Sequence, residues 1–409
     1  MWKKIVIGIC CVVVTISLVI YYQIQRINAQ LAQALQQHHV TFRHLDFALY
    51  PTTQLTLSDA YWQHPQQDAK VRSIFAEKLH LELDFWSLLT PQYAIKTFSF
   101  EKGKLWSNEQ TAPEFSDLNG KLTGDFLIEP EQVSMMNMTF DLQLDRPLFF
   151  NTTQIQLSLT KGMIQRLSPL TYQLQWDDVQ FNGEYFPLLK AKLEMASKQG
   201  LSLIGEIDYS AHQHPSHFSV SIQPQSESEK NLQLQAENLV LEQWLKVLNL
   251  PVLISGSASL SGQFRLVGQQ AQQGHVEAMI QQGELKGLNL LTLVANYLPI
   301  NLDKAQFSEK RTDTAFDKLN TNLTWQQQTL VLNALSFETK EVLVSGVGRV
   351  DLSNMQCDIK LNLALNQPNY SAFKLPIHFF DHCRSPRYKV EWNKQFRHQL
   401  KDLLKQKFR

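Results

Sequence analysis

The sequence predicts a mostly β fold, in which an N-terminal transmembrane helix precedes a mainly antiparallel β-sheet with a few short helices. Three observations carry this prediction. The first is an uncharged apolar run at the N-terminus, Ile5–Tyr22. The second is the alternation of apolar and polar residues over many short segments, which is typical of strands with one buried face. The third is the scarcity of long helical patterns between these segments. Parallel strands need long connections, usually helices, so this scarcity favours an antiparallel sheet.

The apolar run is long enough to be a membrane anchor. Its 18 residues include Ile5, Val12, Leu18 and Tyr22. At about 1.5 Å per residue a helix of this length approaches the roughly 30 Å of a hydrocarbon core. Two lysines precede the run, so we expect the N-terminus in the cytoplasm and the bulk of the chain outside it. A cleaved signal peptide is the alternative, but the run is long for one, and the nearest Ala-x-Ala, Ala32–Ala34, comes late.

Alternation with period 2 dominates from residue 41 onward. One early segment places four apolar residues on one side of the pattern: Leu79, Leu81, Leu83 and Phe85. A segment near the C-terminus does the same with Ile359, Leu361, Leu363 and Leu365. Each set predicts one apolar face of a sheet, and alternation alone does not say whether that face is open or packed shut as a core.

The remaining patterns divide the chain into predicted regions. Residues 1–22 form the anchor, residues 23–40 a helical stalk, and residues 393–409 a basic amphipathic helix. Between them we expect two β regions, 41–240 and 241–392. The second is expected to carry short helices near residues 241–250 and 288–298, where apolar residues recur at helical spacing.

Charge is balanced over the whole chain but not at its C-terminal end. The 38 Lys and Arg residues equal the 38 Asp and Glu residues, which gives no electrostatic indication of nucleic-acid binding. From Arg384 to Arg409, nine basic residues stand against two acids, Glu391 and Asp402. This predicts a helix that lies on an anionic membrane surface, docks on a partner, or caps a sheet edge, and these three interpretations stay open.

Four cysteines allow at most one bridge outside the anchor. Cys10 and Cys11 belong to the apolar run. Cys357 and Cys383 lie in the region expected outside the cytoplasm, where a disulfide persists, but the sequence does not give their geometry.

No catalytic or metal-binding motif stands out. Gly346 and Gly348 lack the third glycine of a dinucleotide fingerprint. The cluster His378, Asp381, His382 and Cys383 has metal-ligand residue types, but no second cluster completes a site, and a solvated loop is expected. The histidines of residues 212–217 are expected in a polar hairpin. We therefore expect neither an enzyme, nor a cofactor, nor a metal.

Several motifs in order resemble those of the AsmA family of Gram-negative bacteria. The N-terminal half has the Tyr-Pro turn Tyr50–Pro51, a leucine-alternating strand, the corner Trp86–Leu89 and the strand Phe98–Leu105. The C-terminal half adds four stretches in family order: Ser255–Phe264, Gly274–Val294, Thr314–Thr339 and Val344–Leu365. The segment Leu375–Trp392 stands where the family has a strand, a loop and an x-Pro-x-Tyr step.

The resemblance implies a single-pass inner-membrane protein whose bulk lies in the periplasm. It implies an elongated, curved sheet, similar to that of chorein-type bridge-like lipid transfer proteins, with an apolar groove for phospholipid or another membrane lipid. The candidate lining of this groove is the two sets of alternating apolar residues, 79–85 and 359–365. Outer-membrane assembly components are expected as partners.

Two functions remain in competition. The first is lipid binding and transfer that supports outer-membrane assembly or phospholipid transport between the two membranes. The alternative is a structural assembly factor that binds outer-membrane protein precursors or partners through sheet edges, without conducting lipid.

Overall fold

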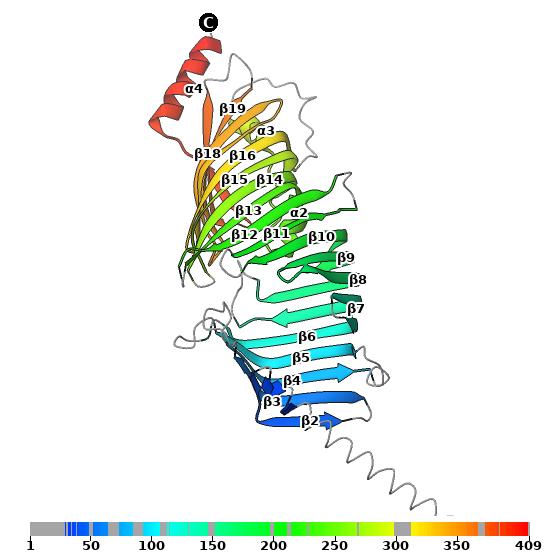
Figure 1. The fold of residues 1–409 in the computed structure, drawn as a ribbon. Helices are drawn as coiled ribbons and strands as arrows, with labels where there is room; N and C mark the ends of the chain where they lie inside the picture. Colours follow the sequence, from blue (N-terminus) through cyan, green and yellow to red (C-terminus); the bar gives the residue numbers. More distant parts are fainter. Residues whose placement is uncertain are drawn as a thin grey trace, which may run out of the picture. The chain divides into compact units, whose positions relative to one another are not determined.

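The structure is a computed structural model, and Figure 1 shows its fold. It describes residues 29, 32–33, 35–37, 39–48, 52–63, 73–84, 93–106, 113, 115–129, 131–145, 152–196, 200–210, 214–226, 229–267, 270–297, 312–366, 373–383 and 385–407. The predicted anchor, with Ile5, Val12, Leu18 and Tyr22, lies outside these residues, as do Phe85, the Tyr50–Pro51 turn and the Trp86–Leu89 corner. Within the described part of the chain, no helix has the length and hydropathy needed to cross a bilayer.

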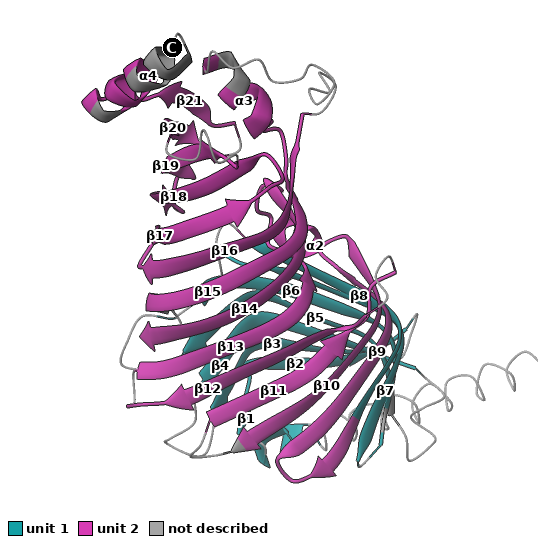
Figure 2. Ribbon diagram, turned by 90° about the horizontal axis from the view of Figure 1, so that it is seen from above, with its two compact units in different colours: residues 1–148, 153–164 teal, residues 149–152, 165–409 magenta. Residues whose placement is uncertain are grey.

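The chain forms two compact units, coloured separately in Figure 2, and each is described by itself. Unit 1 contains residues 1–148 and 153–164, and unit 2 contains residues 149–152 and 165–409. The predicted regions 41–240 and 241–392 divide the sequence at another point and stay a prediction.

Unit 1 is an antiparallel sheet whose strands from β2 onward each pair with the next one in sequence. The short β1 pairs with β3 as well. Its strands are β1 (Val40–Thr41), β2 (His44–Ala48), β3 (Thr53–Gln63), β4 (Ser73–Leu83), β5 (Tyr93–Trp106), β6 (Phe115–Ile128) and β7 (Gln132–Gln143). Strand β8 (Gln154–Ser168) contains the boundary between the units.

Unit 2 repeats this arrangement from β9 to β21, again with antiparallel neighbours in sequence order. The mostly β, antiparallel prediction is confirmed. The strands are β9 (Thr171–Phe181), β10 (Glu184–Ala196), β11 (Gly200–Ile207), β12 (Ser216–Pro224), β13 (Glu229–Val240), β14 (Ile254–Val267), β15 (Gln270–Leu285), β16 (Thr314–Gln326), β17 (Thr329–Glu338), β18 (Val342–Asp351), β19 (Gln356–Leu365), β20 (Lys374–His382) and β21 (Arg387–Val390).

Three short helices accompany the sheet of unit 2: α2 (Leu241–Val247), α3 (Leu290–Tyr297) and α4 (Lys394–Lys407). They lie where the sequence predicts helices. After the C-cap Leu248 of α2, Asn249 has a left-handed backbone (φ 54°), and the Leu250 amide donates to the Leu245 carbonyl at 2.7 Å. This is the Schellman end of a helix. The indole Nε1 of Trp244 donates to the hydroxyl of Tyr209 at 3.0 Å and holds α2 on the sheet.

Aromatic rings of the apolar faces lie over glycines of the neighbouring strand. In unit 1 Phe100 is paired with Gly120, and in unit 2 Phe264 is paired with Gly274. A Cβ atom at either glycine would overlap the ring. Glycine at these positions therefore allows the ring to lie close to the neighbouring strand, and the ring covers the apolar face at a position where the glycine has no side chain.

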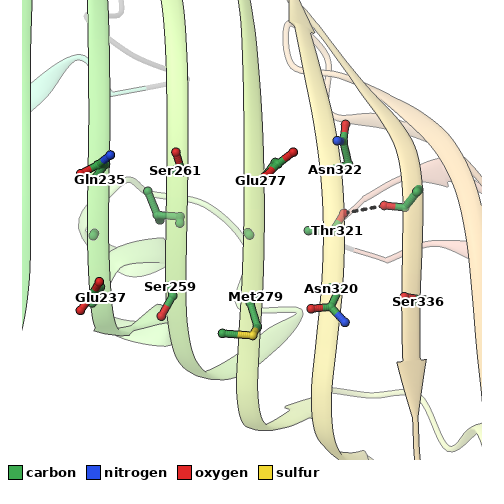
Figure 3. Close-up of a pocket in the computed structure, with 14 residues that line it drawn as sticks. Gln235, Glu237, Ser259, Ser261, Glu277, Met279, Asn320, Thr321, Asn322 and Ser336 are labelled. Atoms are coloured by element: carbon green, nitrogen blue, oxygen red, sulfur yellow. Dashed lines mark hydrogen bonds between the residues drawn. The ribbon is translucent and has the colours of Figure 1, made fainter.

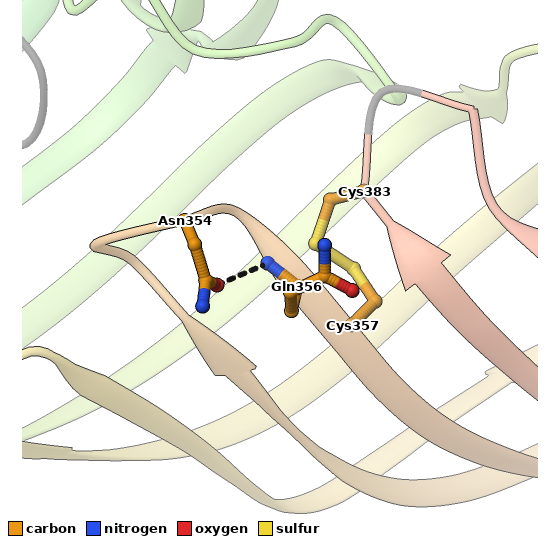
Figure 4. The surroundings of a disulfide bond; sticks show 4 residues. All are labelled: Asn354, Gln356, Cys357 and Cys383. Carbon is orange, nitrogen blue, oxygen red and sulfur yellow. Dashed lines mark hydrogen bonds between the residues drawn. A yellow bond between two sulfur atoms is a disulfide. The ribbon is translucent and has the colours of Figure 1, made fainter.

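Cys357 and Cys383 form a disulfide, so the pairing that the sequence left open is settled in this structure. The bond joins the start of β19 to the residue after β20, with a Cα–Cα distance of 5.3 Å (Figure 4). Both cysteines are buried in a small cluster with Leu352 and Met355. The amide of Cys383 also donates to the Met355 carbonyl at 2.7 Å. The disulfide and this hydrogen bond therefore join Cys383 to the same region at the start of β19.

Replacing both Cys357 and Cys383 by alanine should lower the free energy of unfolding by roughly 2–4 kcal/mol, because the loop between them regains freedom in the unfolded chain. Urea denaturation of the wild type and the double variant measures this difference. Wild-type protein treated with a reductant is the control and should match the variant. Equal stability of the double variant and the oxidised wild type would contradict the prediction.

The ring-over-glycine pairs predict a strong coupling between Phe264 and Gly274. Gly274→Ala should cost about 1–3 kcal/mol by overpacking. The same substitution made together with Phe264→Ala should cost much less, because the ring that the methyl group meets is gone. Denaturation of the four proteins of this cycle gives the coupling energy. An equal cost of Gly274→Ala in both backgrounds would show that the ring is not the cause.

Candidate functional site: the apolar face of the sheet

The apolar face of unit 2 contains one uninterrupted cross-strand row, which we call the open row. Strand register places one residue from each strand, β9 to β21, in this row. Every member is apolar, aromatic or glycine: Tyr172, Leu193, Leu203, Val220, Leu234, Gly262, Val276, Leu323, Leu332, Gly348, Ile359, Phe379 and Tyr388. At about 4.8 Å per strand the row is roughly 60 Å long.

The open row is only partly shielded from solvent. Most of its side chains are half-buried, Phe379 is buried in the core cluster of α3 and α4, and Tyr388 at the end of the row is 48% exposed. Val276, Leu323 and Leu332, in the middle, belong to neither of the two clusters of buried residues found in unit 2. The row therefore presents apolar surface that the fold itself leaves uncovered.

A parallel row on the same face, here called the covered row, is fully buried. It consists of Ala258, Ile280, Leu319, Phe337, Val344, Leu363 and Leu375, whose exposed fractions lie between 0% and 5%. All seven belong to one core cluster with Leu290, Leu293 and Val294 of α3 and Phe396 of α4. Helices thus close one side of the apolar face, and the adjacent side stays open.

Helix α3 is held on the sheet by polar contacts at its N-terminal end. The hydroxyl of Thr314 accepts from the Leu290 amide at 2.9 Å and donates to the Leu288 carbonyl at 2.6 Å. The side chain of Asn289 accepts from the Thr292 amide at 2.9 Å, which caps the helix. These contacts tie the cover of the apolar face to the first residue of β16.

The turn before α3 is fastened by a carboxylate. The backbone amide of Gly287 and the hydroxyl of Thr312 donate to Asp313 and hold the pKa of its carboxyl below the usual range. A lowered pKa means that this contribution is present above the ordinary carboxyl pKa of about 3.9 and is lost only as the pH falls through the lowered value. The turn is therefore at full strength at neutral pH.

Unit 1 has an apolar face of the same construction. One row runs through Phe47, Leu55, Leu81, Phe98, Leu122 and Phe140, and the next through Leu45, Leu57, Leu79, Phe100, Gly120 and Leu142. Phe47, Leu55 and Leu57 are buried, whereas the members from β4 and β5 are half-buried. None of α2, α3 and α4 belongs to this unit.

The predicted lining residues fall into two groups in the structure. Leu79, Leu81 and Leu83 are half-buried on the apolar face of unit 1, and Ile359 lies in the open row. Leu361, Leu363 and Leu365 are instead core residues, exposed by 7%, 1% and 1%. The physical reason is that α3 and α4 lie on their part of the face, which alternation cannot reveal. As lipid contacts all of these residues stay a prediction.

The sequence missed most of the open row. Leu323, Leu332 and Val276 sit in alternating segments, but their alignment across strands depends on register. Bulges shift that register, for example between Leu332 and Leu335 in the β17–β18 pair. The glycines at 262 and 348 were the one sequence feature that could have pointed to the open row, because a glycine on a strand places no polar side chain there.

The opposite face of unit 2 is polar. Over β13 to β17 it carries a shallow hollow of about 580 Å³, shown in Figure 3, into which Gln235, Glu277 and Asn322 project. Thr321 donates to the Ala334 carbonyl at 3.0 Å. Nowhere in the described part of the chain do three His, Cys, Asp or Glu residues group as metal ligands would. Residues 378–383, expected in a solvated loop, lie instead in and directly after strand β20, with Cys383 buried in the disulfide and His378 bonded to Asp358 at 2.7 Å.

Comparison with known proteins adds two relatives. No protein-family model matches the chain. An uncharacterized protein of Haemophilus influenzae is 25% identical over 408 residues, which is 100% of both chains. Protein AsmA of Escherichia coli is 23% identical over 306 residues, or 66% of this chain and 48% of AsmA. The chain is distantly similar to AsmA. The matched part is about half of the length of AsmA, so the likeness concerns a portion of that protein.

The two rows predict different costs of truncation. Leu363→Ala in the covered row should destabilise unit 2 by roughly 2–5 kcal/mol, because it leaves a cavity in a closed core. Leu332→Ala in the open row should cost about 1 kcal/mol, because the side chain loses less buried area. Urea denaturation compares them, and equal costs would mean that the open row is packed shut.

Proposed function

We propose that this protein binds membrane lipid on its apolar face and supports lipid transfer, or outer-membrane assembly, between the inner and outer membranes. The observation that carries the proposal is the open row, a continuous apolar strip of which, within the described residues, only Phe379 is a buried member of the helix-covered core. The distant similarity to AsmA agrees with it. We further propose that residues 5–22 anchor the chain in the inner membrane with its bulk in the periplasm.

Lipid fits such a face for a simple physical reason. Acyl chains need apolar surface, and each Å² of it removed from water is worth about 25 cal/mol. A charged head group needs water, which remains available where the strip is open. The protein then has to supply surface and no reacting groups, so we propose a carrier without enzymatic activity.

A photoreactive amino acid placed in the open row tests the proposal. Introduced at Leu332 or Leu323 in cells, it should crosslink to lipid, which mass spectrometry identifies in the purified adduct. Introduced at Ser345 or Ser336, on the polar face of the neighbouring strands, it should give no lipid adduct. Lipid adducts at neither position, or equally at both, would refute lipid binding by this face.

A charge in the open row should remove bound lipid without unfolding the protein. We expect Leu332→Asp to lower the lipid that copurifies with detergent-free protein, since a carboxylate beside an acyl chain loses its hydration. Ser336→Asp on the polar face is the matched control and should keep its lipid. Circular dichroism shows that both variants are folded, and undiminished lipid in a folded Leu332→Asp protein would contradict the proposal.

Strand β21 favours the alternative function. It pairs with β20, and within the described residues no further strand adjoins it. Such an edge accepts an added strand from an outer-membrane protein precursor. The same photocrosslinking separates the two functions, because polypeptide adducts at Tyr388 without lipid adducts at Leu332 would favour an assembly factor.

A further inference from the structure

The C-terminal end of unit 2 carries an excess of positive charge. Between Lys374 and Lys401 the sequence has seven Lys and Arg residues against two acids, Asp381 and Glu391. Asp381 is paired with Arg387. Glu391 lies 3.8 Å from Lys360 and 3.7 Å from His378 Nδ1. Both of these carboxylates are thus engaged by other groups, and the sequence of α4 itself has five Lys and Arg residues against one acid, Asp402.

Helix α4 turns its apolar side to the sheet. Phe396 is 1% exposed, with its ring centroid 5.3 Å from that of Phe373 and 5.1 Å from that of Trp392. Leu400, one turn later, is half-buried against the same core. In this structure α4 therefore packs on the core of the sheet, whereas the edge strand β21 has no further strand beside it among the described residues. Phe396 and Leu400 are used in this packing and are not available for insertion elsewhere.

The basic side of α4 remains free. Lys394, Arg397 and Lys401 are all exposed, and their spacing of three and four residues places them on one stripe of the helix. Arg397 donates to the Trp392 carbonyl, from Nε at 3.1 Å and from Nη2 at 3.0 Å. Within the described residues no acidic side chain forms an ion pair with any of the three.

Two exposed aromatic residues flank this stripe. Trp392 precedes α4 and is 50% exposed, and Tyr388 of β21 is 48% exposed. The Tyr388 side chain lies on the apolar face, with its ring centroid 5.9 Å from that of Phe379, whereas Lys389 lies on the opposite face of β21. Tryptophan and tyrosine with lysine and arginine are the residues that settle at the boundary between head groups and acyl chains.

We propose that Lys394, Arg397 and Lys401 of α4, with Trp392 and Tyr388, form a basic face that docks on the anionic surface of a bilayer. Charge complementarity with phosphate head groups drives the contact, and the two aromatic side chains enter the interfacial layer. Docking does not require that lipid occupy the open row. It does have a consequence for the proposed function, because the open row ends at Tyr388, and docking brings that end to a membrane.

A flotation experiment tests the basic face. The full chain is reconstituted in phosphatidylcholine nanodiscs and mixed with vesicles rich in phosphatidylglycerol or made of phosphatidylcholine alone. We expect binding to the anionic vesicles only, and less of it as salt rises. Replacing Lys394, Arg397 and Lys401 together by glutamine should weaken binding on the order of 100-fold, at about fivefold for each basic residue.

Matched controls make the outcome decisive. Lys78, Lys121 and Lys318 are exposed on strands, and their joint replacement by glutamine changes the net charge equally but should leave binding intact. Thermal melting followed by circular dichroism shows whether α4 and the sheet persist in each variant. Unchanged binding of the α4 variant, an equal loss in the control variant, or equal binding to both vesicle types would overturn the proposal.

Trp392 gives a second, independent readout. Brominated lipid in the anionic vesicles should quench part of the tryptophan fluorescence of the wild type, and the Trp392→Phe variant should lack that part. Absence of such a difference would also count against docking by this face. Lipid that copurifies with the chain is measured on the same α4 variant and should be unchanged, so failure of docking and failure of lipid binding are distinguished.

Discussion

The structure of unit 2 depends on one mismatch: its sheet has more apolar face than its helices cover. Each added strand contributes further apolar side chains to the same face, because antiparallel neighbours keep their alternation in register. Within the described residues, α2, α3 and α4 are the helices available to bury them. The covered row is buried under α3 and α4, whereas most of the open row, two rows further along the same face, is only half-buried. Core packing and open apolar surface are thereby assigned to different rows of one sheet.

This assignment divides single strands. In β19, Leu363 is packed in the core and Ile359, four residues earlier on the same face, lies in the open row. At the end of the strand nearest Ile359, the Cys357–Cys383 disulfide and its small cluster fasten β19 to β20. At that end the strands are joined by a covalent bond, which stabilises them without requiring a helix to lie over the apolar face.

The sequence predicted the strands and helices, but it did not predict which part of the apolar face the helices bury. Alternation around Leu79 and around Leu361 identified strands and their apolar sides, and helical spacing located α2, α3 and α4. Whether a side is open depends on contacts between residues far apart in sequence, such as Leu290 with Leu363, which no local pattern contains. Register is similarly hidden, since bulges within β15 and β17 change which residues share a row. The cysteine pair needed its 5.3 Å Cα–Cα distance before it could be assigned.

Electrostatics shows the same difference between totals and placement. With 38 basic and 38 acidic residues the chain has no net charge, yet the segment from Lys374 to Lys401 is strongly basic. Because Phe396 fixes α4 on the core, that charge is held on one outward stripe instead of being spread around a free helix. The open row reaches its last residue, Tyr388, within the same segment. An apolar strip that ends beside a fixed cluster of cations is chemically matched to a phospholipid, whose tail and head group require these two surfaces side by side.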